Sequence, residues 1–421
     1  MNAVGGDDKA LRPNAVARRI VIVGGSFGGL ACARALAGSD TVVTVIDRRN
    51  HHLFQPLLYQ VSTAALSPAD IAVPIRKVLA RAKNVDVVLD EVVDLNLDER
   101  KVHLAKAASL PFDQLVIATG SVYNYFTNPQ WAKSAPAPKS ISDARTIRSQ
   151  LLRAFEEAET CLDDKRRTAL LTIIVVGGGP TGVEMAGSIA ELARYTLRGN
   201  FRHIDPSSAR VVLIEAGQRL LATFPETMSA YGAIALDRLG VEVRLGNAVQ
   251  AIDEDGVFVA GDRIAAGTVI WGAGIRAALG AEWLGGTEDR GGRIPVDHTL
   301  AVIGKPNVYA LGDVALFQTD GQPLPALAQV AQQQGRHLGR ALRKGEPPSN
   351  FRYRTKGDTA VIGRHAAIYV YRKIRLTGRP AWLLWSFVHV YLLIGFGRRT
   401  SVMFQWIWRY ITFERGARLI D

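Results

Sequence analysis

The hydrophobic residues of this chain are grouped in short apolar runs, and glycine-rich turns follow several of them. Two of them, at 20–23 and 172–176, each lead into a glycine-rich turn and then into a stretch of small residues. Uninterrupted runs of this length predict buried parallel strands, and the small residues predict helices that pack closely against them. The pattern therefore predicts an α/β protein built from strand–turn–helix units.

The C-terminal region has a different pattern. Residues 381–397, AWLLWSFVHVYLLIGFG, are the most apolar run, and as a helix they span about 25 Å, short of the roughly 30 Å hydrocarbon core of a bilayer. In the next segment the polar residues fall on one narrow stripe: Ser401, Gln405, Arg409 and Thr412. A wide Trp-rich face with basic flanks is typical of a helix in the headgroup layer. We therefore expect a membrane-docking region, with a buried dimer interface and a membrane span as alternatives.

The basic charge is concentrated in the same region. The 421 residues have a net charge of +12, and eight of these excess charges lie from Thr359 onward, together with four of the seven Trp. A basic excess suits nucleic acid or an anionic membrane surface, and the Trp content favours the membrane. Residues 1–17 contain acids and lack the apolar core of a secretory signal, so we expect a disordered tail.

The two cysteines, Cys32 and Cys161, are far apart in sequence. Neither belongs to a CxxC or CxxxxC pair, and no spacing of Cys and His fits a metal site. These spacings exclude the cysteine relays of disulfide reductases and sulfide:quinone reductases, and we expect no metal.

The first glycine turn is a dinucleotide-binding fingerprint. It follows a strand, opens a helix and is followed about 20 residues later by a second strand that ends in an acid. Such a turn lets a pyrophosphate approach the helix N-terminus, while the acid binds a ribose hydroxyl. Ser26 stands where the second glycine of GxGxxG is usual. The expected binding residues are Gly24, Gly25, Ser26, Phe27, Gly28, Gly29, Asp47 and Arg48.

A second fingerprint lies about 150 residues further on. Here the turn after the strand 172–176 has the full GxGxxG, and the acid is Glu215. This acid binds a ribose 2′-hydroxyl and repels a 2′-phosphate, which predicts NADH rather than NADPH, although Arg219 is near enough to soften the preference. The expected residues are Gly177, Gly179, Pro180, Thr181, Gly182 and Glu215.

Two such sites in one chain most economically hold FAD in the first and NADH in the second, with two NAD domains as the alternative. Three strand-end turns support this interpretation: Ala118, Thr119 and Gly120; Gly272, Ala273 and Gly274; Gly312 and Asp313. The last of them resembles that of the two-dinucleotide-domain flavoproteins, whose Asp bonds the FAD ribityl chain. The resemblance implies an FAD domain split into 18–140 and 290–345, an NADH domain at 141–289, and a membrane-associating region at 346–421.

A glutamine-rich helix, expected from Pro325 to about Arg343, makes the resemblance more specific. Its Ala328-Gln329-x-Ala331-x-Gln333 resembles the quinone-site motif of the type II NADH dehydrogenases, single-subunit NADH:quinone oxidoreductases that do not pump protons. The segments NHHLFQPLLYQV, PTGVEMAG, KGDTAVIGR, TGRPAW and RGARLI agree, so the resemblance extends from about Arg18 to Ile420.

The resemblance implies a membrane enzyme with non-covalent FAD. NADH reduces the flavin, and a membrane quinone then takes two electrons and two protons. Ala328 and Gln329 are expected beside the flavin, Gln329 and Gln333 at the quinone headgroup, and Glu184 near nicotinamide and flavin. As the alternative for Glu184, an acid in a first helical turn simply complements the helix dipole.

The implied location is the cytoplasmic face of the cell membrane, with the lipid surface and possibly a second copy as partners. A soluble reductase of a ferredoxin-like protein remains an alternative, although it would not need the Trp-rich tail. The second alternative is a non-enzymatic flavoprotein that senses NADH and binds nucleic acid through its tail. Long runs of Trp and Leu are poorly suited to phosphates, so we expect no nucleic acid.

Overall fold

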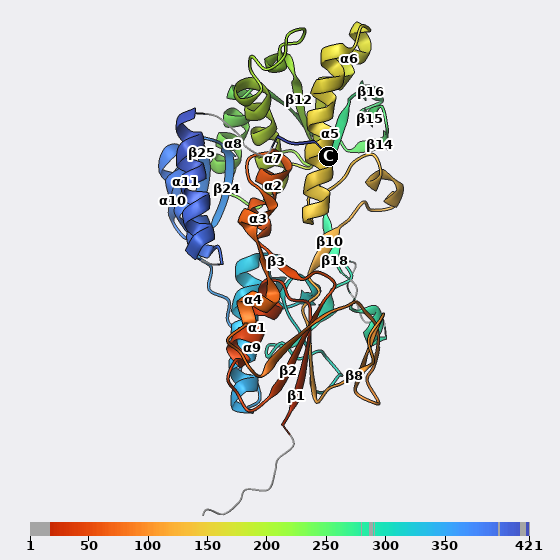
Figure 1. The fold of residues 1–421 in the computed structure, drawn as a ribbon, viewed down its shortest axis with the longest axis vertical. Helices are drawn as coiled ribbons and strands as arrows, with labels where there is room; N and C mark the ends of the chain where they lie inside the picture. Colours follow the sequence, from red (N-terminus) through yellow and green to blue (C-terminus); the bar gives the residue numbers. More distant parts are fainter. Residues whose placement is uncertain are drawn as a thin grey trace, which may run out of the picture.

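The computed structural model describes residues 17–278, 280–285, 289, 291–394, 396–412 and 418–420. Nearly all of the expected N-terminal tail, much of the segment RGARLI and the side chain of Arg409 lie outside the described residues. The described chain forms two lobes, each built on a parallel sheet, with a helical region along one edge (Figure 1).

The first lobe contains a five-stranded parallel sheet in the order β20-β9-β1-β2-β5. Its strands are β1 (Arg19–Val23), β2 (Val42–Asp47), β5 (Val85–Leu89), β9 (Gln114–Ile117) and β20 (Val308–Ala310). Two helices, α1 (Phe27–Leu36) and α9 (Ala328–Lys344), pack against each other beside this sheet. The first expected strand and helix are thus confirmed.

The second lobe repeats the arrangement. Its parallel sheet has the order β13-β12-β11-β17, with β11 (Thr172–Val176), β12 (Arg210–Glu215), β13 (Val241–Leu245) and β17 (Thr268–Trp271). The helices α5 (Ile141–Thr160), α7 (Pro180–Glu191) and α8 (Glu226–Arg238) belong to this lobe, as does an antiparallel sheet of β14 (Val249–Asp253), β15 (Gly256–Val259) and β16 (Asp262–Ala265).

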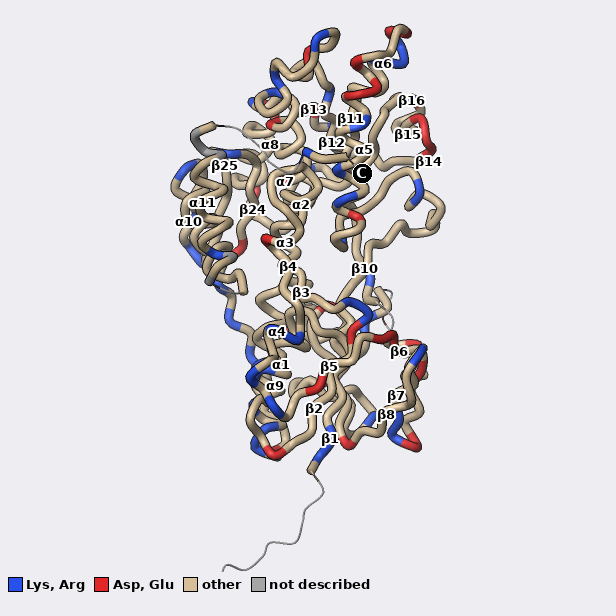
Figure 2. Tube along the Cα trace, viewed as in Figure 1, with Lys and Arg blue, Asp and Glu red and all other residues tan. Residues whose placement is uncertain are grey.

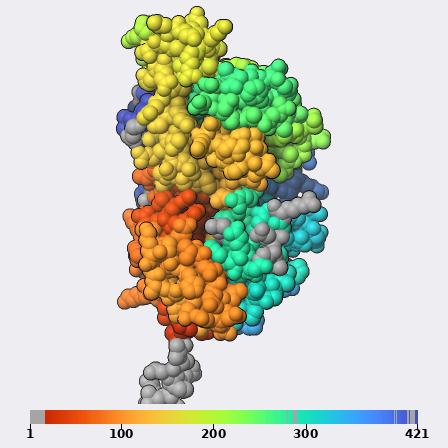
Figure 3. Space-filling model, turned by 90° about the vertical axis from the view of Figure 1, so that its right-hand side faces the viewer, coloured from red at the N-terminus to blue at the C-terminus, as the bar shows by residue number. Residues whose placement is uncertain are grey.

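Two crossing segments join the lobes. The strand β10 (Ser121–Tyr123) leaves the first lobe and pairs antiparallel with β18 (Ile275–Ala277), which returns to it. Beyond β10, Trp131 and Ala135 already pack in the core of the second sheet, whereas Ala281 and Leu284 pack in the core of the first. Figure 3 shows the two lobes meeting on a face away from the helices α10 (Gly378–Leu392) and α11 (Phe396–Thr412).

The C-terminal region packs on the second lobe. An antiparallel sheet of β24 (Asp358–Gly363), β25 (Ala366–Tyr371) and β26 (Ile374–Thr377) leads into α10 (Gly378–Leu392) and α11 (Phe396–Thr412). A Cβ at Gly187 of α7 would lie 1.7 Å from the carbonyl oxygen of Ile362, so β24 lies directly against α7. Among the described helices, none combines the length and the apolar character that crossing a bilayer requires.

The glutamine-rich helix begins later than expected. Pro325 is not in its first turn, because the chain stays extended through Leu327 and α9 starts at Ala328. The helix ends at Lys344, where Gly345 adopts φ +75° and provides the left-handed cap that glycine favours.

Candidate functional site

The first glycine turn makes contacts that no larger residue would allow. Gly24 has φ +104°, and a Cβ there would lie 2.3 Å from the carbonyl oxygen of Ala118. A Cβ at Gly29 would lie 1.8 Å from the carbonyl oxygen of Gly24. Glycine at both positions therefore lets α1 begin directly against β1. Ser26 has an extended backbone at the helix N-cap, so the fold itself does not require glycine there.

The second turn has the same geometry. Gly177 has φ +108°, and a Cβ at Gly182 would lie 1.7 Å from the carbonyl oxygen of Gly177. Gly179 is different, because a Cβ there would meet no atom within 4 Å and its φ is −73°. Close packing therefore explains the glycine at position 182. At position 179 the glycine instead leaves a space that the pyrophosphate of a bound dinucleotide would occupy.

Each turn is tied to the acid at the end of the following strand. Asp47 accepts the N–H of Gly25 at 2.7 Å and the N–H two residues beyond itself at 2.7 Å. Glu215 accepts the N–H of Gly178 at 2.5 Å and, likewise, the N–H two residues beyond itself at 2.7 Å. Both acids are held at the carboxyl end of a strand, where a dinucleotide ribose binds in such folds.

Two arginines near these acids point elsewhere. Arg219 donates to the carbonyl oxygens of Ala222 and Phe224, so its guanidinium is committed to the following loop. Arg48 lies 3.5 Å from Glu91 at the surface. The side chain of Arg219 therefore does not offset the charge of Glu215 as its position in the sequence suggested.

Further polar groups converge at the same edge of the first sheet. The hydroxyl of Thr119 is buried and has no hydrogen-bond partner among the described residues. Ser121 donates to Asp313 at 2.7 Å and accepts from Lys139 at 2.9 Å. An unpaired hydroxyl and a carboxylate beside a glycine turn fit the pyrophosphate and ribityl oxygens of FAD.

Lys139 and Gln334 were not identified from the sequence. Burial lowers the pKa of Lys139, and the carboxylate of Asp313 opposes this shift. Gln334 is buried on α9, and its Oε1 accepts the N–H of Gly312 at 2.7 Å, which fixes the turn that carries Asp313. A run of three glutamines, 332–334, gave no indication of which one faces inward.

Gln329 and Gln333 both contact the extended segment 354–357. Gln329 donates to the carbonyl oxygen of Gly357 at 3.1 Å and accepts the N–H of Lys356 at 3.0 Å. Gln333 donates to and accepts from the backbone of Arg354 at 2.9 and 3.1 Å. Each amide keeps one N–H for a ligand, while the pair also holds this segment against α9.

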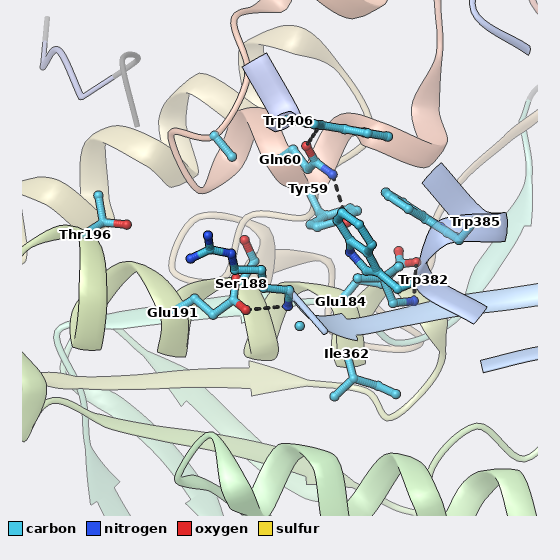
Figure 4. A pocket seen from close by; sticks show the side chains of 14 residues that line it. Tyr59, Gln60, Glu184, Ser188, Glu191, Thr196, Ile362, Trp382, Trp385 and Trp406 are labelled. Atoms are coloured by element: carbon cyan, nitrogen blue, oxygen red, sulfur yellow. Dashed lines mark hydrogen bonds between the residues drawn. The ribbon is translucent and has the colours of Figure 1, made fainter. Parts of the chain in front are cut away.

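Glu184 lies in the wall of a cavity between the second lobe and the C-terminal helices (Figure 4). The cavity volume is about 100 Å³, which is room for a few water molecules. Ser188 and Glu191 of α7 line it beside Glu184. The other walls come from α2 (Leu58–Ser62), β24, α10 and α11, through residues that include Tyr59, Gln60, Ile362, Trp382, Trp385 and Trp406.

Hydrogen bonds and ring stacking fix this cavity. Trp406 donates to Gln60 at 3.0 Å, and Gln60 donates to the hydroxyl of Tyr59 at 3.1 Å. The rings of Trp385 and Trp406 stack with centroids 5.1 Å apart. Tyr59 and Gln60 belong to the segment NHHLFQPLLYQV, but only the fold shows that they meet the tail.

Burial raises the pKa of Glu184 to about 8, and the N–H of Val361, 3.3 Å away, only partly opposes this shift. The folded protein therefore keeps a proton on Glu184 in a pH range where the unfolded chain has lost it. A neutral carboxyl beside a cavity is able to donate a proton as well as a hydrogen bond.

We expect Glu184→Gln to flatten the pH dependence of stability. Between the ordinary carboxyl pKa and about 8, the folded wild type binds more protons than the unfolded chain, so its stability falls as pH rises. From pH 5 to pH 8 the wild type should lose roughly 1–3 kcal/mol more than Glu184→Gln. Thermal unfolding at both pH values measures this, with the exposed Glu157→Gln as control. Parallel pH profiles for wild type and Glu184→Gln would contradict it.

The helix α11 turns the polar side chains of Ser401 and Gln405 inward. Gln405 and Ser401 of α11 donate to the carboxylate of Asp70 at 3.1 and 3.3 Å. The outward side is apolar, and this apolar face consists of Leu383, Phe387, Tyr391, Leu392, Met403, Phe404, Ile407 and Trp408, all exposed. This distribution is the reverse of a helix on the surface of a water-soluble protein. Trp406, expected on the outward apolar face, is instead buried, as is Trp385.

Comparisons with known proteins agree on one family. Residues 18–335 match the pyridine nucleotide-disulphide oxidoreductase family. The chain is 39% identical to a type II NADH:quinone oxidoreductase of Mycobacterium tuberculosis, over 96% of this chain and 90% of that protein. It is 29% identical to a type II NADH:quinone oxidoreductase of Haemophilus influenzae, over 83% of this chain and 86% of that protein. The fold superposes on NDH2 of Plasmodium falciparum in complex with NADH, with a TM-score of 0.86, 22% identity, and coverage of 94% and 98%.

Proposed function

Since the chain belongs to the type II NADH:quinone oxidoreductases, within the pyridine nucleotide-disulphide oxidoreductase family, we propose that it works docked on a membrane through its apolar face. The enzyme oxidises NADH and reduces a quinone. Bound FAD supplies the chemistry, by accepting a hydride from NADH and passing two electrons to the quinone. A quinone carries a lipid tail, so an enzyme that rests on the bilayer reaches its acceptor there.

The inward polar stripe of α11 is the observation that carries the docking proposal. Because Asp70 binds Ser401 and Gln405, the helix is fixed with its apolar side toward the surroundings. An exposed apolar surface of this kind is stabilised by a bilayer or by another protein chain. A soluble reductase or an NADH-sensing module would have no use for it. We infer binding on the cytoplasmic side, where NADH is available, without a membrane span.

The two glycine turns divide the cofactors between the lobes. We propose that FAD lies over the turn Gly24–Gly29, with Asp47 at its ribose and Asp313 at its ribityl chain. NADH then lies over the turn Gly177–Gly182 with Glu215 at its ribose, and its nicotinamide points toward Glu184 and the FAD ring. In this proposal Ala118, Thr119 and Gly120 approach FAD, and Gly272, Ala273 and Gly274 approach NADH.

Glu215 should select NADH over NADPH. With Arg219 committed elsewhere, only the carboxylate acts on the 2′ position, so we expect wild-type kcat/KM to favour NADH. Glu215→Gln keeps an oxygen for the N–H of Gly178 but removes the charge, and should narrow the preference by roughly tenfold or more. Steady-state rates with both nucleotides measure this, with the exposed Glu226→Gln as control. Equal use of both nucleotides by the wild type would refute the assignment.

The glutamines of α9 test the quinone site. We expect Gln329→Leu and Gln333→Leu each to slow reoxidation of the flavin by quinone roughly tenfold, while bleaching of the flavin by NADH changes little. Stopped-flow absorbance separates these two half-reactions. If both half-reactions slow equally, the glutamines act by holding segment 354–357 rather than by contacting the quinone.

A further inference from the structure

A groove lies between α1 and α9, and of the residues assigned to FAD, NADH or quinone only Phe27 is part of its lining. Four arginines line it, Arg34 from α1 and Arg336, Arg340 and Arg343 from α9, and we call it the arginine groove. The cavity volume is about 490 Å³, within the range of small-molecule sites. Its remaining lining consists of two polar residues, His52 and Gln332, and five apolar ones: Phe27, Leu30, Ala31, Ala35 and Ile394.

The groove carries uncompensated positive charge. Neither α1 nor α9 contains a single Asp or Glu. Arg34, Arg336 and Arg340 are exposed, and no carboxylate of the described chain lies within 4 Å of any of them. Arg336, Arg340 and Arg343 recur at i, i+4 and i+7, so they share one face of α9, where like charges repel one another. An anion bound in the groove would remove this repulsion.

Close packing of the two helices brings these charges together. A Cβ at Gly335 would lie 2.1 Å from the carbonyl oxygen of Gly28, and one at Gly339 would lie 2.7 Å from that of Cys32. The backbones of α1 and α9 are therefore in direct contact, and the arginines of both helices border the same narrow groove. This arrangement is fixed by the fold and not by flexible loops.

The groove continues into the membrane-docking region. Ile394, two residues beyond the end of α10, forms part of its lining. The residue before it, Leu393, accepts a hydrogen bond from Nε of Arg399 through its carbonyl oxygen. Figure 2 shows Lys and Arg positions along α9 on the same edge of the molecule as α10 and α11. If the apolar face rests on a bilayer, Ile394 brings one end of the arginine groove close to the headgroup layer.

We propose that the arginine groove binds the phosphate of an anionic phospholipid. The guanidinium groups of Arg34, Arg336 and Arg340 hold the phosphate, and the glycerol and first acyl carbons lie over the half-buried Ala31, Ala35 and Ile394. The apolar lining favours a lipid over a free phosphate ion, which would leave these side chains exposed to water. This inference rests on the proposed membrane docking, and it adds a lipid preference to it.

The test is vesicle binding by the full-length protein with FAD bound. Co-sedimentation is measured with vesicles of phosphatidylcholine alone and with an equal mixture of phosphatidylcholine and phosphatidylglycerol. We expect the wild type to prefer the mixture, and Arg34→Gln/Arg336→Gln/Arg340→Gln to lose roughly 10- to 100-fold of that preference. The matched control Arg81→Gln/Lys83→Gln/Arg238→Gln removes the same charge from exposed positions elsewhere and should keep the preference.

The possible results separate the two proposals. Equal loss in both triple variants would mean diffuse attraction and would overturn the groove as a site. Equal wild-type binding to both vesicle types would overturn it while leaving membrane docking intact. Failure of the wild type to bind either type would instead refute docking itself. If the wild type shows no lipid preference but binds inorganic phosphate, and the Arg34/Arg336/Arg340 variant does not bind it, the groove takes a free anion rather than a lipid.

Discussion

Phe387→Glu combined with Phe404→Glu is expected to release the protein from the membrane fraction. Both side chains are more than 60% exposed at the centre of the apolar face. Burying one Phe in an apolar surrounding gains about 1.5–3 kcal/mol, so losing two and adding two charges should lower membrane partitioning by roughly 100-fold or more. The variant should retain FAD and still reduce a water-soluble acceptor with NADH, because both substituted side chains are exposed and neither belongs to a glycine turn. Reduction of a long-tailed quinone in vesicles should fall most.

Leu162→Glu with Ile303→Glu is the matched control, since both residues are exposed and apolar but lie outside the C-terminal helices. It should stay with the membrane. Light scattering, which measures the oligomeric state, tests the rival explanation that the apolar face is a dimer interface. If the Phe387/Phe404 variant changes from dimer to monomer while its membrane binding persists, the apolar face is a subunit interface. If the variant loses FAD and precipitates, these side chains belong to the core.

Gly182→Ala is expected to lower the stability of the protein, whereas Gly179→Ala is expected to weaken only NADH binding. A Cβ at position 182 lies 1.7 Å from a carbonyl oxygen, so α7 must shift away from β11. We expect a loss of stability of about 1–3 kcal/mol and a large loss of NADH-driven flavin bleaching, because α7 also carries Glu184. A Cβ at position 179 meets nothing, so stability should be unchanged while NADH binding weakens through contact with the pyrophosphate.

Thermal unfolding and stopped-flow bleaching, done on both variants, check this pair. Retention of FAD in each is the control, because the first lobe is untouched. Should Gly179→Ala bind NADH as tightly as the wild type, the dinucleotide does not pass over this turn.

The two dinucleotide-binding folds could be predicted because the residues that define each of them lie close together in the sequence. A strand, a glycine turn and a distant acid follow one another in sequence, and the structure ties Gly25 to Asp47 and Gly178 to Glu215 as such a motif requires. The start of α9 was misplaced by three residues, because Pro325 is acceptable both in a first helical turn and in the extended segment before it.

The walls of the cavity could not be predicted, since they combine distant segments. The hydrogen bond from Trp406 to Gln60 links residues 346 positions apart. The sequence of α11 showed a polar stripe and an apolar face but not which side meets the protein. Only the position of Asp70 decides this, by giving Ser401 and Gln405 a buried acceptor.

The order of strands in the first sheet bears on how the protein folds during synthesis. The strand β20 completes that sheet beside β9, yet the whole second lobe lies between them in the chain. At 5–20 residues per second, β9 leaves the ribosome roughly 10–40 s before its neighbour. The second lobe, built from one continuous stretch, is therefore expected to fold first, and FAD to be taken up only after α9 has been made. A ribosome stalled far enough beyond β17 for this strand to have left the exit tunnel should already hold a protease-resistant second lobe, but no flavin.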